Sequence, residues 1–344
     1  MTTIPQYYKT NLNDIEMAIK TVNKAKVETI CYSAGERPVY MLCYGAPNKF
    51  FRTANLSSSL GGRDKYCFAD KTSPDYKPTL LLVGCVHGGE FEGTAALLNL
   101  VSIIETGSDL AGNEFTDLKS LTDEINLLII PCANPDGRSH VPFDSFVGKS
   151  FNDLRYYNQG TWLDGTLCGW PECKKRHPIK EYVDYLGGYF NDDGVNLMHD
   201  DFFGKKALET EALFGVCEQY VPDFTVLLHG GTNCTNHILG PAYAPIEIKQ
   251  RVADFEQLLK QEYEDKGLTL YTPNVNFDYG ESKDTPVSFN LPSALTHLCG
   301  EPCVTYESNQ GLVDSPSGTG YSYDEIYDHH LLLFKSLIKY LIKK

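Results

Sequence analysis

The chain has 344 residues, of which 42% are hydrophobic and 12% aromatic, and its formal net charge is −15. This composition supplies enough apolar side chains for a large core without disulfides. Nucleic acid is an unsuitable partner for so acidic a chain, because phosphates require clustered Lys and Arg. The first residues show no secretory signal, and no apolar run approaches the roughly 18 residues of a membrane span. We therefore expect a soluble, cytoplasmic protein that binds neither nucleic acid nor membrane, with its cysteines reduced.

Apolar runs that read as strands alternate along the chain with amphipathic runs that read as helices. Strands are predicted at 79–86, 125–131, 224–228 and 302–306, and helices at 92–104, 208–220, 245–264 and from about 324 onward. Strands that are apolar throughout are typical of a sheet covered on both faces. The alternation therefore predicts an α/β fold with a largely parallel or mixed sheet between layers of helices.

Residues 138–193 break this pattern, because they are rich in Gly, Asn, Asp, Tyr and Trp and show little periodicity. A loop region of that length in a compact protein is usually functional. No linker is visible along the chain. We therefore predict a single domain over residues 1–344, to which residues 1–45 add a helix and edge strands.

The best local feature is a His and a Glu three residues apart, His87 and Glu90, directly after the strand predicted at 79–86. Gly88 and Gly89 between them allow the sharp bend that would turn both side chains toward one ion. Imidazole nitrogen and carboxylate oxygen both suit Zn²⁺. The pair is weak evidence alone, but its position at the end of a strand strengthens it.

Two further ionisable residues follow predicted strands, His229 after 224–228 and Glu307 after 302–306. Sites in α/β sheets form at the carboxyl ends of the strands. Three separate strands would therefore deliver His87, His229 and Glu307 to one edge of the sheet. Each residue alone could equally be an ordinary polar group in a loop, so the prediction depends on their convergence.

Two His and one Glu hold a zinc ion and leave a fourth position open for water, as catalytic sites require. The sequence thus predicts one Zn²⁺ per chain, with His87, Glu90 and His229 as ligands. Such an ion lowers the pKa of a bound water and polarises a carbonyl. Glu307, outside this ligand set, is the candidate general base that would take the proton of the water.

At these residues the chain resembles the zinc carboxypeptidase (metallocarboxypeptidase) family, for which a His, Glu, His ligand set is known. Further matches follow the order of that family, at Ser33–Tyr40, Asn134–Gly137, Pro222–Phe224 and Thr305–Glu307. The resemblance covers most of the chain. It implies a three-layer α/β/α fold around a mixed, roughly eight-stranded sheet.

The substrate side departs from the family pattern. Family members that cleave C-terminal residues carry an Asn and an Arg that clamp the terminal carboxylate, whereas here Met198 and His199 stand at those positions. A histidine gives at most one charged contact in place of a bidentate guanidinium. The chain therefore resembles an atypical, bacterial-type member without the clamp, in which His199 lines the pocket or has a structural role.

Three further residues and one segment are candidates that the resemblance suggests. Arg138 and Arg155 both lie where the family places an arginine that stabilises the oxyanion, and Tyr279 is a candidate for a phenol that closes the site. The segment 162–177 has no counterpart in the digestive members. Its aromatic and basic residues could bind substrate, but we favour a packed surface insertion.

The resulting hypothesis is a zinc-dependent metallopeptidase that hydrolyses an amide bond of a peptide or a small peptide-like substrate. Cell-wall fragments and γ-linked chains are possible substrates, because the clamp is absent. The alternatives are an N-acyl amino-acid deacylase of the aspartoacylase type and a catalytically silent binding protein on the same scaffold.

Overall fold

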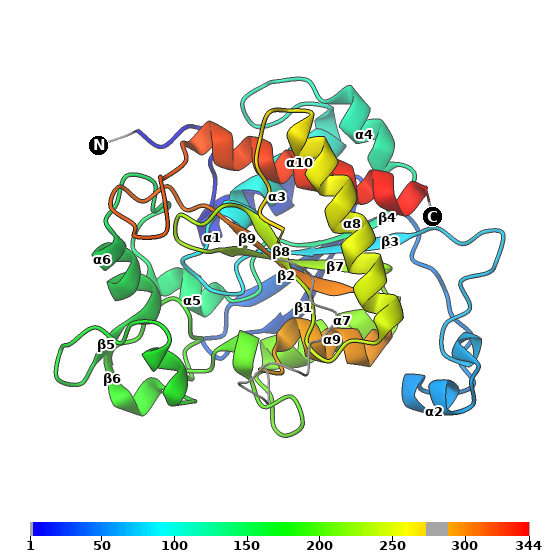
Figure 1. Ribbon diagram of the computed structural model, residues 1–344, viewed down its shortest axis with the longest axis horizontal. Coiled ribbons are helices and arrows are strands. Elements are labelled where there is room, and N and C mark those ends of the chain that lie inside the picture. Colours follow the sequence, from blue (N-terminus) through cyan, green and yellow to red (C-terminus); the bar gives the residue numbers. More distant parts are fainter. Residues whose placement is uncertain (1–2, 273–287, 344) are drawn as a thin grey trace.

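The computed structural model describes residues 3–272 and 288–343. Within them, a seven-stranded sheet crosses the molecule with helices on both faces (Figure 1). This is the predicted three-layer α/β/α architecture, with seven strands in the described main sheet where about eight were expected. No helix of the described chain is both long and apolar enough to cross a membrane.

The strand order of the main sheet is β1-β2-β4-β3-β7-β9-β8. The central strands β4, β3, β7 and β9 are parallel, and β1, β2 and β8 pair antiparallel toward the two edges. The bounds are β1 (Lys26–Tyr32), β2 (Pro38–Tyr44), β3 (Thr79–Val83), β4 (Asn126–Ile130), β7 (Phe224–Gly230), β8 (His237–Leu239) and β9 (Cys303–Ser308). The four predicted strands are thus confirmed as the parallel centre of the sheet.

The helices divide between the two faces of the sheet (Figure 1). One face carries α3 (Glu92–Thr106), α4 (Thr116–Thr122), α8 (Ile246–Glu264) and α10 (Tyr323–Ile342), and the other carries α7 (Leu208–Tyr220) and α9 (Leu291–Cys299). Outside these layers, α1 (Leu12–Thr21) contacts α3, and α2 (Leu56–Gly61) lies at the far end of the molecule. The four helices predicted from the sequence are confirmed.

The central strands are mostly apolar because alternate side chains along each strand face opposite sides of a sheet that is covered on both faces. In β3, Leu80 and Leu82 join the cluster under α3 and α10, whereas Leu81 and Val83 join the cluster under α7 and α9. All four side chains are 0% exposed. The sheet is therefore buried on both faces, and its ionisable side chains at the site come from the carboxyl ends of the strands.

The region predicted as one long loop contains short elements that form a small lobe beside the sheet. Within residues 138–193 lie α6 (Phe151–Leu154), the π-helical turn η2 (Arg155–Gln159), the paired strands β5 (Thr161–Trp162) and β6 (Val183–Tyr185), and the 3₁₀ turns η3 (Glu172–Lys175) and η4 (Lys180–Tyr182). The helix α5 (Pro135–His140) overlaps the start of this region, and the 3₁₀ turn η5 (Leu197–His199) follows it. Cys168, Cys173, Ile179 and Phe190 form a core of its own under this lobe. Both cysteines are free, as expected for reduced core thiols.

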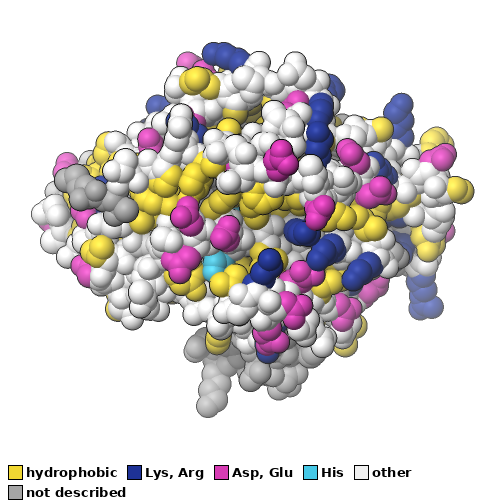
Figure 2. All heavy atoms as spheres, turned by 90° about the horizontal axis from the view of Figure 1, so that it is seen from above, with side chains coloured by type: hydrophobic (Ala, Val, Ile, Leu, Met, Phe, Trp, Pro, Cys, Tyr) yellow, Lys and Arg dark blue, Asp and Glu magenta, His cyan; other side chains and the backbone are white. Residues whose placement is uncertain are grey.

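The surface view agrees with the acidic but mixed composition of the chain. On the face shown in Figure 2, Lys and Arg side chains are interspersed with Asp and Glu side chains, and a band of hydrophobic side chains runs between them.

Arg138 connects α5 to the N-terminal segment. Its guanidinium donates to the carbonyls of Thr10, Val141 and Phe143 at 2.9–3.0 Å, and it stacks over the ring of Phe91 at 4.5 Å. The residue is 3% exposed. A buried guanidinium that donates to three backbone carbonyls has a structural role, because buried polar groups need hydrogen-bond partners.

We predict that Arg138→Met destabilises the fold by roughly 2–4 kcal/mol, because buried carbonyls lose their donor. Urea unfolding would measure the difference. Lys205→Met is the matched control, since Lys205 is exposed and its truncation should leave the midpoint unchanged. A midpoint of Arg138→Met equal to that of the control would contradict this structural role.

Candidate metal centre

The carboxyl ends of three parallel strands meet at the edge of the sheet that faces the lobe. His87 and Glu90 lie in the turn between β3 and α3, and His229 is the penultimate residue of β7. Glu307 on β9 is the ladder partner of His229. The strands therefore bring together the four residues that the sequence predicted would converge.

The three predicted metal ligands converge around the carboxylate of Glu90. Nδ1 of His87 lies 2.9 Å from Oε1 of Glu90, and Nδ1 of His229 lies 2.7 Å from Oε2. One donor atom from each residue lies within 4.8 Å of the others. All three residues are buried. Two imidazoles and one carboxylate so close together are the donor set that zinc prefers.

The second nitrogen of His87 determines which nitrogen is available to a metal. Nε2 of His87 lies 3.2 Å from the amide oxygen of Asn196, which can only accept a hydrogen bond. Nε2 therefore carries the proton, and Nδ1 offers its lone pair toward Glu90. The ring of Tyr189 stacks on His87 with centroids 4.0 Å apart and fixes the plane of the imidazole. Partners of this kind orient metal-binding histidines.

The charges within the trio keep Glu90 ionised. Burial alone would raise the pKa of Glu90, but the two histidines outweigh it and hold that pKa below its usual range. Burial also lowers the pKa of His87, which favours the neutral imidazole that binds metals. In the described chain, Nε2 of His229 is buried without a hydrogen-bond partner. The site fits a divalent cation between an ionised carboxylate and two imidazoles.

Glu307 lies outside the trio on the same cavity. Burial and the charge of Glu90 raise its pKa to about 7, against the lowering effect of His229 and Lys174. A carboxyl group with a pKa near neutrality can both accept and return a proton. Glu307 therefore lies beside the candidate metal ligands without being one of them.

Paired glycines allow the His87–Glu90 turn to sit against the turn of residues 134–137. A Cβ on Gly88 would lie 1.9 Å from the carbonyl carbon of Gly137, and one on Gly89 would lie 1.9 Å from the amide oxygen of Asn158. Asn134 caps the adjacent turn by accepting from the backbone N–H of Gly137. The backbones of residues 87–90 and 134–137 therefore pack directly against each other, and a side chain at position 88 has no space.

An open cavity of about 560 Å³ contains the trio and Glu307. Of the other predicted site residues, Arg155 and His199 line this cavity. Arg138 does not line it, and its donors are used in the structural contacts described above. Tyr279 lies outside the described residues. Of the two arginine candidates, the structure brings only Arg155 to the cavity.

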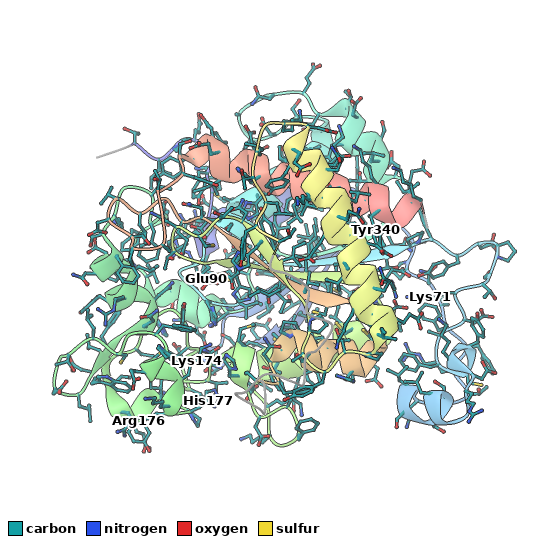
Figure 3. All side chains as sticks on the ribbon, viewed as in Figure 1. Lys71, Glu90, Lys174, Arg176, His177 and Tyr340 are labelled. Atoms are coloured by element: carbon teal, nitrogen blue, oxygen red, sulfur yellow. The ribbon has the colours of Figure 1, made fainter. Side chains whose placement is uncertain are left out.

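Sequence reasoning missed several lining residues. Tyr189 and Asn196 hold His87, and Trp170 and Lys174 come from the segment 162–177 that we expected to be a packed insertion. Figure 3 shows Lys174 on the side of the lobe nearer Glu90, with Arg176 farther out. The aromatic and basic content of the segment was a signal. The orientation of the segment depends on the small core of the lobe, and the sequence shows no periodicity from which that core could be predicted.

Comparisons with known proteins agree with this geometry. A sequence profile described as zinc carboxypeptidase matches residues 15–156, which include His87 and Glu90. No curated protein matches the chain significantly. Among solved structures, a metallo-carboxypeptidase from Burkholderia cenocepacia aligns with a TM-score of 0.60 and 13% identity over 96% of this chain and 69% of that one.

Two further structures share the fold. A metallo-carboxypeptidase from Pseudomonas aeruginosa, in complex with (2-guanidinoethylmercapto)succinic acid, aligns with a TM-score of 0.54 and 16% identity over 95% of this chain and 68% of that one. Bovine thrombin-activatable fibrinolysis inhibitor, in complex with tick carboxypeptidase inhibitor, aligns with a TM-score of 0.56 and 12% identity over 98% of this chain and 99% of that one. At such identities the likeness establishes the fold.

The fold and the trio define an α/β protein with a candidate single-metal site at the carboxyl edge of its sheet. The profile match, together with the fold, confirms the resemblance to zinc carboxypeptidases. The chain is thus similar to zinc carboxypeptidases in its fold and over residues 15–156, and His87, Glu90 and His229 form a candidate zinc-binding site. His229 and Glu307 lie beyond the matched segment, so their part in the site comes from the structure.

We predict about one zinc per purified chain, measured by elemental analysis after dialysis. His229→Ala should reduce this to a small fraction, because two remaining ligands hold zinc poorly. His237→Ala is the matched control, since His237 lines the same cavity but is outside the trio. Zinc retained in His229→Ala, or absent from the unmodified chain, would contradict the ligand assignment.

We predict that Gly88→Ala destabilises the fold by about 1–3 kcal/mol, as overpacking at a backbone contact does, and also weakens zinc binding. Urea unfolding and elemental analysis measure the two effects. Gly61→Ala is the control, because nothing lies within 4 Å of its Cβ position. Equal free energies of unfolding for the two variants would contradict the prediction, because they would show that the turn accommodates a Cβ at position 88.

Proposed function

We propose that this protein hydrolyses an amide bond of a peptide or peptide-like substrate, with one zinc ion held by His87, Glu90 and His229 and with Glu307 as general base. The observation that carries the proposal is a buried ligand trio beside a separate carboxylate on one open cavity. A structural zinc site would be closed by a fourth protein ligand. Within the described residues the trio has no fourth member.

The bound zinc would supply Lewis-acid chemistry, lowering the pKa of water and polarising the substrate carbonyl. Glu307 accepts a proton from the attacking water at a carboxylate oxygen and then gives it to the leaving amine. Its pKa near 7 suits both transfers. Asn196 and Tyr189 hold the imidazole of His87 in one orientation throughout.

Arg155 is the proposed partner for the negative charge that develops on the carbonyl oxygen. Its side chain lines the same cavity as the trio and Glu307, and a positioned cation stabilises negative charge that develops in the transition state. His199 is proposed to contact substrate as a neutral group, because burial, with a further contribution from Lys174, lowers its pKa to about 3. It therefore carries no charge at neutral pH.

A peptide-like substrate is supported by the shape and lining of the cavity. Its volume of about 560 Å³ admits a chain of a few residues, and apolar rings from Phe151, Trp170 and Tyr189 line it beside polar groups. An N-acyl amino acid would occupy less of that space. We therefore favour a peptide over an N-acyl amino acid as the substrate.

We predict that Glu307→Gln keeps about one zinc per chain but hydrolyses at least about 10²-fold more slowly, because a general base contributes 10²–10⁴-fold. The assay uses two panels on the zinc-loaded protein, N-acetylated dipeptides with varied C-terminal residues and N-acyl amino acids. Release of free amine is measured for each.

Each outcome of this assay is decisive. Cleavage of the dipeptides alone supports the peptidase, and cleavage of the N-acyl amino acids alone supports the deacylase. A well-folded, zinc-loaded chain that cleaves neither panel supports a silent binding protein. Unchanged turnover in Glu307→Gln would refute the role of that residue.

A further inference from the structure

The pair formed by His229 and Glu307 lies close to the end of the ladder between β7 and β9. The two residues are ladder partners, and one further pair, Gly230 and Ser308, follows them. The ends of strands open more readily than their centres. Opening at this end would move the metal ligand away from the proposed base. The separation of His229 and Glu307 therefore depends on what holds the two chains together beyond their last ladder pair.

Gln310 holds the two chains together at that point. Its backbone N–H donates to the carbonyl of Thr232 at 2.5 Å, and its side-chain Oε1 accepts from the N–H of Thr232 at 2.9 Å. The residue is 1% exposed. Both backbone groups of Thr232 are thus bound by one residue, two positions past the last ladder pair on each chain. We call these two hydrogen bonds the Gln310 bridge.

The Gln310 bridge lies directly behind the wall of the cavity. A Cβ on Gly230 would lie 2.7 Å from both Cγ and Cδ of Gln310, which is closer than such atoms can approach. The side chain of Gln310 therefore packs against the backbone of Gly230, the residue that follows His229 and lines the cavity. Gln310 itself does not line the cavity.

The residue that the bridge holds has an unfavourable backbone conformation. Thr232 has a φ of 59°, and a β-branched residue adopts a positive φ only where the surrounding contacts enforce it. Its hydroxyl donates to the carbonyl of Gly231 at 2.6 Å and lies 2.5 Å from the hydroxyl of Ser317. Strained residues of this kind cluster at functional sites. Thr232 lines the same cavity as Glu307, so the strain is located where precise placement matters.

We propose that Gln310 is a positioning residue that sets the separation between His229 and Glu307 by bridging the two chains beyond the end of the β7–β9 ladder. This inference rests on the proposed function, in which Glu307 is the base beside the metal ligand His229. A misplacement of about 1 Å in a catalytic site costs on the order of 10²-fold in rate. Gln310 therefore controls the chemical step through the backbone, without contact with the substrate.

Asn99 on α3 provides a matched comparison for a purely structural role. It is 0% exposed, and its amide also joins two backbone segments. Its Nδ2 donates to the carbonyl of Tyr7 at 2.9 Å, and its Oδ1 accepts from the N–H of Leu110 at 3.0 Å. Asn99 does not line the cavity. Asn99→Leu therefore removes an equivalent buried amide at a position remote from the metal ligands.

The kinetic test uses the zinc-loaded protein and the best dipeptide of the panel. Gln310→Met keeps the length of the side chain but removes the acceptor for the N–H of Thr232. Its kcat should fall by roughly 10- to 100-fold, because the base and the metal ligand are no longer held in place. Its KM should change by less than about threefold, since no contact with the substrate is lost. Asn99→Leu should lower the midpoint of urea unfolding but leave kcat and KM unchanged. Elemental analysis should find about one zinc per chain in each variant.

Amide hydrogen exchange on the zinc-free protein separates this inference from the proposed function. The N–H of Gly231 donates to the carbonyl of Ser308 at 2.8 Å, across the end of the ladder. In Gln310→Met its exchange should accelerate by roughly tenfold, the value of one hydrogen bond. The N–H of Ala133, which donates to the carbonyl of Gly84 at 3.0 Å beyond β3 and β4, should exchange as before. If the unmodified chain cleaves no peptide, the proposed function fails, and the exchange of Gly231 still tests the bridge.

Three results would overturn the inference. The first is an unchanged exchange rate of the Gly231 N–H in Gln310→Met. The second is a loss confined to KM, which would indicate a contact with the substrate. The third is an equal loss of kcat in Asn99→Leu, which would reduce the effect to general stability. If circular dichroism shows that Gln310→Met is misfolded, Gln310→Asn replaces it, because its amide is one methylene too short to reach Thr232, and the same outcomes apply.

Discussion

The carboxylate of Glu90 between two imidazoles is the contact on which the rest of the site depends. Taking an ionised carboxylate out of water is costly unless opposite charge or strong donors compensate for it. Here the compensation comes from His87 in the β3–α3 turn and His229 at the end of β7. The register of the parallel strands must therefore be fixed, since a slip of one residue would point a ligand side chain toward the opposite face of the sheet.

Buried strands explain why the metal centre can be so well defined. The four central strands carry mostly apolar side chains on both faces before their carboxyl ends, with Thr225 and Thr305 as buried exceptions inside β7 and β9. The ligands thus lie at the end of a rigid, close-packed and mostly apolar layer. The backbone contact of Gly88 with Gly137 then fixes the turn that carries His87. Preorganisation of the ligands follows from the packing of the sheet and of two glycine-containing turns.

The sequence was informative wherever one periodicity continued over several residues. The central strands, the long helices and the residues at the strand ends could all be predicted, because burial on both faces leaves an unmistakable apolar run. The lobe could not, since elements such as Thr161–Trp162 and Glu172–Lys175 are too short to show a period. Arg138 and Arg155 also lie in short elements without a clear period, so the sequence did not show which of them reaches the site. Only three-dimensional contacts reveal that Arg138 is committed to three backbone carbonyls.

The separate core of the lobe has a consequence for how such an enzyme diversifies. Cys168, Cys173, Ile179 and Phe190 pack with one another, apart from the clusters that cover the sheet. Insertions, deletions or exchanges in the β5–β6 hairpin can therefore reshape the walls that meet the substrate while the strands that carry the ligands stay fixed. The candidate metal ligands belong to the sheet and Trp170 and Lys174 to the lobe, so the two parts of the cavity are packed separately, and a transplanted lobe would be a starting point for redesigning the cavity walls.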